Sequence, residues 1–120
     1  MWFRLYKRFK KATPTISWNR IENLAVPGMP DTLAYTKYNH FFTVEFKVTK
    51  SNKIRFSPHQ IAFHVKHPRN SFILVEDLGQ RSVKLFPGSG IKALDAWGLS
   101  LEPLCLTLDA CGSFFEELGA

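Results

Sequence analysis

Three acidic residues stand out in the first part of the sequence, because they occur among many basic residues. Glu22, Asp31 and Glu45 are the only acids in the first 75 positions, against thirteen lysines and arginines. Acids that merely solubilise a surface tend to be interspersed with bases. Carboxylates within a basic stretch are instead suited to Mg²⁺, which prefers oxygen ligands. The sequence therefore predicts a metal site in a surface that attracts polyanions.

The spacing of Glu45 and Lys47 predicts that both side chains point to one face of a strand. Apolar residues at 42, 44, 46 and 48 alternate with polar residues at 43, 45 and 47, which is the period of a half-buried strand. One ammonium group and one carboxylate then share a surface. A lysine in this place could orient or deprotonate a metal-bound water.

The residues before this strand indicate how Asp31 could join Glu45. The stretch 33–37 reads as a preceding strand and 38–40 as a short connection, so a hairpin is expected. Asp31 precedes the first strand and follows Pro30, whose ring fixes the entering backbone. An antiparallel pair would bring Asp31 close to the later part of the second strand, where Glu45 lies.

These residues carry a resemblance to a known group of enzymes. Pro30-Asp31, then Glu45-Phe46-Lys47, with Glu22 upstream, resembles the PD-(D/E)xK nuclease superfamily. The stretch from about 20 to 75 is most similar to its small Holliday-junction-resolvase-like and VRR-NUC-like members, which include short phage endonucleases. Gly28-Met29-Pro30-Asp31 and Ser57-Pro58-His59-Gln60 belong to the same resemblance.

The resemblance implies a role for each matching residue. Glu22, on the first helix of that family's site, would bind the metal together with Asp31 and Glu45, and the backbone carbonyl of Phe46 would help. Lys47 would act on the attacking water. The side chain of Gln60 would point at the site. Glu22 lies nine residues before Asp31, a shorter connection than many resolvases have.

The function that the resemblance implies is metal-dependent hydrolysis of DNA phosphodiester bonds with Mg²⁺ or Mn²⁺. Selectivity for branched DNA such as a Holliday junction, and pairing of two subunits as a homodimer, are implied in the same way. A cytoplasmic location is expected, in the host cell if the protein is phage-encoded. The alternative is a non-catalytic, basic nucleic-acid-binding module in which the acids are structural.

The net charge of +6 is distributed unevenly and favours a polyanionic partner. Residues 1–15 are predicted to form a basic amphipathic segment, helical over 2–11. Either this helix contacts DNA, or it docks its aromatic side chains on the domain and leaves a solvated basic face; both could hold together. The bases expected to contact the phosphate backbone are Arg4, Lys7, Arg8, Lys10, Lys11, Lys50, Lys53 and Arg55.

The predicted fold is α/β, with the restriction-endonuclease-like core that the resemblance implies, in one domain spanning 1–120. A mixed sheet of four or five strands would be flanked by helices. Further strands are predicted at 71–75 and 82–86, and a turn at 87–90. Further helices are predicted at 17–24, 58–66, 91–97 and 108–118, with Ser17 and Ser57 as N-caps of the first two.

Other classes of site and location are disfavoured by the sequence. No apolar run approaches 18 residues, so no membrane span is expected, and the basic start does not resemble a signal peptide. The two cysteines are expected to be reduced thiols. His59 and His64 are five positions apart, which is the wrong spacing for a helical zinc site.

Overall fold

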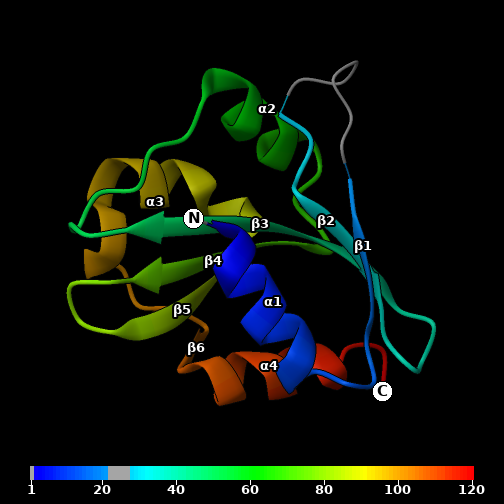
Figure 1. Cartoon of the computed structure of the whole chain (residues 1–120). Helices are drawn as coiled ribbons and strands as arrows, with labels where there is room; N and C mark the ends of the chain where they lie inside the picture. Colours follow the sequence, from blue (N-terminus) through cyan, green and yellow to red (C-terminus); the bar gives the residue numbers. More distant parts are fainter. Residues whose placement is uncertain (1, 22–27) are drawn as a thin grey trace.

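A computed structural model describes residues 2–21 and 28–120, which form one mixed sheet with helices on both faces (Figure 1). The strands are β1 (Ser17–Arg20), β2 (Thr32–Tyr35), β3 (Phe41–Thr49), β4 (Ser71–Asp77), β5 (Ser82–Pro87) and β6 (Cys105–Leu106). The α-helices are α1 (Trp2–Ala12), α2 (Pro58–Lys66), α3 (Ile91–Trp97) and α4 (Leu108–Glu116), and the 3₁₀ turns are η1 (Gly88–Gly90) and η2 (Gly98–Ser100).

The six strands follow one another across the sheet in sequence order. Neighbouring strands are antiparallel except for β3 and β4, which are parallel. A parallel pair cannot be joined by a tight hairpin, and α2 provides the crossover between β3 and β4. The expected mixed sheet is thus confirmed, with a higher strand number because β1 and the short β6 extend its edges.

The predicted helix over 17–24 is wrong for the residues that the structure describes there. Ser17 to Arg20 form β1, which pairs with β2 so that Trp18 lies opposite Ala34. Only Trp18 of this strand is buried. A four-residue segment carries too little periodicity to separate helix from strand, and pairing with a distant strand decided its structure. The rest of that predicted helix lies outside the described residues.

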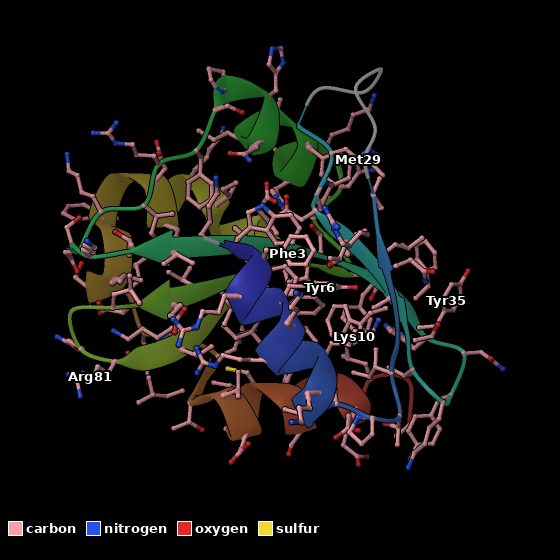
Figure 2. The ribbon with its side chains drawn as sticks, viewed as in Figure 1. Phe3, Tyr6, Lys10, Met29, Tyr35 and Arg81 are labelled. Atoms are coloured by element: carbon pink, nitrogen blue, oxygen red, sulfur yellow. The ribbon has the colours of Figure 1, made fainter. Side chains whose placement is uncertain are left out.

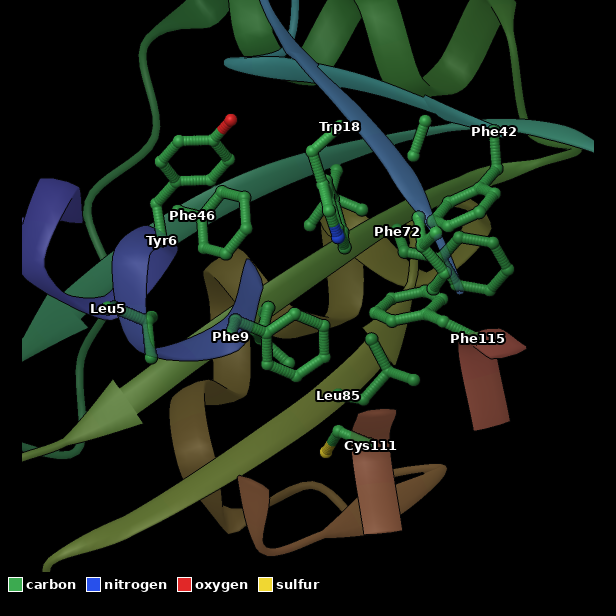
Figure 3. Packing of buried hydrophobic residues seen from close by; sticks show 14 of the residues in the cluster. Leu5, Tyr6, Phe9, Trp18, Phe42, Phe46, Phe72, Leu85, Cys111 and Phe115 are labelled. Carbon is green, nitrogen blue, oxygen red and sulfur yellow. The ribbon is translucent and has the colours of Figure 1, made fainter. Parts of the chain in front are cut away.

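Helices α1 and α4 pack together on one face of the sheet over an aromatic core (Figures 1 and 3). Phe9 of α1 is fully buried and meets Trp18 and Phe115 edge to face. Phe42 of β3 stacks on Phe115 with ring centroids 4.8 Å apart. Such offset and perpendicular ring contacts stabilise a core beyond the area that they bury.

The first helix behaves as its amphipathic pattern predicts. Leu5, Tyr6 and Phe9 of α1 are buried, whereas its lysines and arginines are exposed. Figure 2 labels Tyr6 and Lys10 on this helix; Tyr6 is buried and Lys10 is exposed. Docking of the aromatic side chains, one of the two interpretations of this segment, is therefore confirmed.

Helices α2 and α3 pack on the opposite face of the sheet, over a smaller aliphatic core that includes Ile73, Val75 and Leu94. The N-terminus of α2 is fixed by a capping box between Ser57 and Gln60, with Pro58 in the first turn. The predicted helices 58–66 and 91–97 are confirmed by α2 and α3. No helix within the described ranges is long and apolar enough to cross a membrane.

Candidate metal and nucleic-acid site

Strand β3 is longer than β2, and the candidate site lies beside the part of β3 that is not paired with β2. The pairing of the two strands ends with Thr32 opposite Val44, so Asp31 lies just past the end of β2, beside Glu45 and Phe46. Oδ2 of Asp31 accepts a hydrogen bond from the backbone N–H of Phe46 at 2.9 Å. The carbonyl of a strand residue points to the same side as its N–H. The carbonyl of Phe46 therefore faces Asp31 as well.

Glu45 is almost completely buried, with 1% of its surface exposed. Its pKa is raised to about 9, first by burial and then by the neighbouring carboxyl group of Asp31. Lys47 acts in the opposite direction on this pKa. The carboxyl groups of the half-buried Asp31 and the buried Glu45 are thus close together at this edge of the sheet.

Gln60 links Glu45 to Lys47. Nε2 of Gln60 donates to Oε1 of Glu45 at 2.6 Å, and Oε1 of Gln60 accepts from Nζ of Lys47 at 3.0 Å. The same Oε1 also accepts from the backbone N–H of Ser57, as part of the capping box of α2. The start of the helix therefore fixes the glutamine, and the glutamine fixes both charged side chains of β3.

The side chains of this edge surround a pocket of about 340 Å³, lined by Asp31, Glu45, Phe46, Lys47, Val48, Gln60 and Trp2. Trp2 is a residue of the site that the sequence did not reveal. It reaches the pocket from the first turn of α1 and stacks on Phe46, with ring centroids 6.0 Å apart. The guanidinium of Arg20 lies 4.1 Å from the ring of Phe3 and 5.6 Å from that of Trp2, at the same end of α1.

Gly28 explains how the segment before β2 comes so close to α2. Its φ is +80°, in the left-handed region that favours glycine. A Cβ at this position would lie 2.1 Å from the backbone oxygen of His59, in the first turn of α2. The absence of a side chain at Gly28 thus allows the chain that leads to Asp31 to pack directly on the helix that carries Gln60.

The donor set of the pocket fits a hard divalent cation. Oε2 of Glu45 is buried and has no hydrogen-bond partner among the described residues. Asp31 and Phe46 line the same pocket, and carboxylate and carbonyl oxygens are the donors that Mg²⁺ or Mn²⁺ takes. A cation at this place would also favour the ionised form of Glu45, which burial and Asp31 disfavour.

The part of the chain that the structure describes does not bring a third acidic ligand to this pocket. Within residues 2–21 and 28–120, no three His, Cys, Asp or Glu side chains are grouped so that they could hold a metal. Glu22, the third predicted ligand, lies outside the described residues. Helix α1, whose first turn reaches the pocket, contains no acid.

A larger, basic groove adjoins the pocket and shares Lys47 and Val48 with it. It has a volume of about 1250 Å³ and follows the end of β3 and the loop toward α2. Lys50, Lys53 and Arg55, three of the residues predicted to contact DNA, line this groove. Among the residues that the structure describes, Asp95 of α3 is the acidic residue of its lining.

The predicted phosphate contacts of the N-terminal segment lie elsewhere. Arg4, Lys7, Lys10 and Lys11 are exposed on α1, which covers the face of the sheet opposite to α2 and α3. Arg8 is engaged by Glu76 of β4 in an ion pair of 2.6 Å. The basic surface of α1 and the basic groove are therefore two separate regions, and the groove is the one continuous with the carboxylate pocket.

The comparisons with known proteins agree with this arrangement at the level of fold. No family model matches the sequence, and no curated protein matches it. The structure of Hjc from Archaeoglobus fulgidus, a Holliday junction resolvase from an archaeal hyperthermophile, matches with a TM-score of 0.52. The match covers 72% of this chain and 72% of Hjc, at 15% identity. The restriction-endonuclease-like α/β fold expected from the sequence is therefore confirmed, but likeness at this identity does not transfer a function.

Proposed function

We propose that this protein is a metal-dependent endonuclease of the PD-(D/E)xK type that hydrolyses DNA phosphodiester bonds. The observation that carries the proposal is the convergence of Asp31, Glu45 and Lys47 on one pocket, with Gln60 hydrogen-bonded to both residues of β3. These are the residues that the sequence motif selects. The fold shared with a Holliday junction resolvase supports the same assignment.

In this proposal the carboxylates of Asp31 and Glu45 and the carbonyl of Phe46 would hold Mg²⁺ or Mn²⁺. A bound divalent cation would polarise the phosphate and lower the pKa of a coordinated water. Asp31 already receives the N–H of Phe46 and Glu45 already receives the amide of Gln60. Both carboxylates are thus oriented by the protein itself, which reduces the reorganisation that cation binding requires.

Lys47 is placed to act on the attacking water. Its ammonium group is held by Oε1 of Gln60 at 3.0 Å and lies over the ring of Phe56 at 5.3 Å. These two contacts restrict a long, flexible side chain to the wall of the pocket. From there it would orient the water, and its charge would stabilise the negative charge that develops on the phosphate.

The substrate would be bound along the basic groove. Lys50, Lys53 and Arg55 are positioned to contact successive phosphates of a strand that enters the pocket at Lys47. Preference for branched DNA and action as a homodimer belong to the same proposal. Both rest on the resolvase resemblance and on the shared fold, not on a feature of the groove.

The test is incubation of the protein with matched labelled DNAs: a four-way junction, a flap, a nicked duplex and an intact duplex, each with Mg²⁺, Mn²⁺ or EDTA. We expect strand cleavage that depends on the cation and is fastest on a branched substrate. Binding without cleavage of any substrate would contradict the proposal and favour the alternative, a non-catalytic binding module.

Lys47→Ala should separate chemistry from binding. We expect cleavage to fall by about 10²–10⁴-fold, whereas DNA affinity measured by fluorescence anisotropy without metal changes little. Lys37→Ala, which removes an exposed lysine of the β2–β3 connection, is the matched control and should cleave normally. If Lys47→Ala loses affinity and cleavage to the same extent, Lys47 is a phosphate contact and its proposed role in chemistry is wrong.

Metal binding can be tested without the reaction. Because Trp2 lines the pocket, its excitation should sensitise the luminescence of Tb³⁺ bound by Asp31 and Glu45. Mg²⁺ or Mn²⁺ should displace Tb³⁺ and abolish the signal, and Asp31→Asn should weaken Tb³⁺ binding. A signal that is unaffected by Asp31→Asn would place the cation elsewhere.

A further inference from the structure

A second cavity lies beside the carboxylate pocket and is not used by the proposed chemistry. It has a volume of about 510 Å³, within the range of sites that bind small organic groups. Leu33, Phe41 and Phe63 form apolar walls, and His67, Arg69 and Asn70 bring polar groups to it. Figure 2 shows Met29, a further wall residue, between α2 and the start of β2.

The register of the sheet fixes the position of this cavity relative to the site. Thr43, which lines the cavity, precedes Glu45 by two residues on β3, so both side chains point to the same face. Leu33 lies opposite Thr43 and follows Asp31 by two residues. The cavity and the two carboxylates are therefore neighbours, about 6.6–6.8 Å apart along the strands.

The chemistry of the cavity fits a flat, partly apolar group with a polar edge. Phe41 is a strand residue that is 44% exposed, and Tyr35 holds its ring edge to face with centroids 5.0 Å apart. Such a fixed, accessible ring is suited to stacking. The side chains of His67 and Asn70 also line the cavity, so a polar edge of the occupant could form hydrogen bonds there.

The surrounding charge identifies the class of occupant. Arg69 is an exposed cation beside the cavity, and the whole chain carries +6. An occupant attached to a polyanion is therefore favoured over a second copy of this basic chain. A nucleobase offers a stacking face and a polar edge, and the strand that carries it supplies the backbone phosphate.

We infer that this cavity binds an unpaired nucleobase next to the phosphate held at Asp31 and Glu45. This inference rests on the proposed function and extends it to the substrate. The strand that is cut would carry an unstacked base at or beside the cut. Branch points, flaps and loops supply such bases without the cost of unpairing a duplex. The cavity would therefore contribute to a preference for branched over intact DNA.

The experiment measures binding and not cleavage. A duplex with a single unpaired 2-aminopurine is titrated with the protein in EDTA, and the fluorescence of the base reports its stacking. We expect quenching by the wild type and an affinity about tenfold or more lower for Phe41→Ala. Tyr38→Ala is the matched control, because Tyr38 is similarly exposed, at 41%, in the same hairpin but does not line the cavity.

A duplex with an abasic site in place of the unpaired base separates the base from the backbone. Wild type and Phe41→Ala should bind this duplex equally, because the contact that differs between them is absent. Phe63→Leu keeps the wall apolar but removes the ring, and it provides the same comparison if Phe41→Ala does not fold by circular dichroism. Equal affinities of wild type, the folded wall variant and Tyr38→Ala for the 2-aminopurine duplex would overturn the inference.

The two proposals can fail independently. Base-dependent quenching without cleavage in Mg²⁺ or Mn²⁺ would remove the nuclease function and leave the nucleobase site in place. Cleavage of branched DNA without quenching, at a rate unchanged by the wall variants, would remove the nucleobase site and leave the nuclease function in place.

Discussion

His64 should make the stability of the protein depend on pH in a defined window. It is fully buried on α2, and its Nδ1 is bonded to Oγ of Ser71 at 2.6 Å. Gly88 packs against the ring so closely that a Cβ there would lie 2.7 Å from Nδ1. Burial, and then the positive charge of Lys47, lower the pKa of His64 to about 4, from 6.5. The folded protein therefore resists protonation of this side chain.

The sign and size of the effect follow from proton linkage. Between pH 6.5 and about 4 the unfolded state takes up a proton at His64 that the folded state does not. Stability is thus complete above pH 6.5 and is lost as pH falls through this window, with a slope of up to about 1.4 kcal/mol per pH unit. The total loss near pH 4 would be about 3 kcal/mol, a large part of the stability of a small domain.

The assay is urea unfolding, followed by tryptophan fluorescence at several pH values from 4 to 7.5, of wild type and His64→Gln. Because its packing is altered, His64→Gln should lower the free energy of unfolding by an amount that does not depend on pH. It should lack the part of the pH dependence that comes from protonation of His64. The difference between the two proteins cancels the other titrating groups. His59→Gln, at an exposed position of the same helix, is the control and should keep the wild-type slope. If the free energy of unfolding depends on pH in the same way for wild type and for His64→Gln, the reasoning is refuted.

Three further predictions concern the scaffold around the site. Phe9→Ala should lower the free energy of unfolding, measured by urea denaturation, by about 3–5 kcal/mol. Phe3→Ala, at an exposed position, should lower it much less. Replacing both Lys7 and Lys11 by Gln should weaken the binding of every DNA to a similar extent. The slope of log affinity against log salt concentration should become shallower by about 0.9 for each phosphate contact that is lost. An unchanged slope would exclude these two lysines from the DNA interface. Gly28→Ala should lower the free energy of unfolding by at least about 1 kcal/mol. It should also reduce the rate of cleavage, since the added Cβ would push Asp31 away from α2. A variant with wild-type stability and wild-type cleavage would contradict this prediction.

The sequence by itself determined the local geometry of β3 and of the start of α2. The alternation from Phe42 to Val48 places Glu45 and Lys47 on one face in any strand, because side chains alternate with a period of two. The start of α2 is likewise local: Ser57 as N-cap and Pro58 in the first turn are confirmed, and the structure adds a capping box with Gln60. Local rules sufficed here because each involves residues within a few positions of one another.

Tertiary structure decided the features that depend on contacts between distant segments. Ser17 to Arg20 form a strand and not the predicted helix, because pairing with β2 outweighs the weak preference of a four-residue segment. Trp2 enters the carboxylate pocket because α1 docks its buried face on the aromatic core. No sequence spacing relates Trp2 to Phe46, so no periodic pattern could have revealed this wall.

The same distinction holds for the electrostatics of the site. The expected hairpin predicted that Asp31 and Glu45 would lie close together, but only the folded chain shows that Glu45 is almost fully buried and that Gln60 joins it to Lys47. Burial depends on how α2 packs on β3, and that packing requires the close approach of Gly28 to His59. Sequence spacing specifies which side chains share a face, whereas the exclusion of water from them is a property of the assembled tertiary structure.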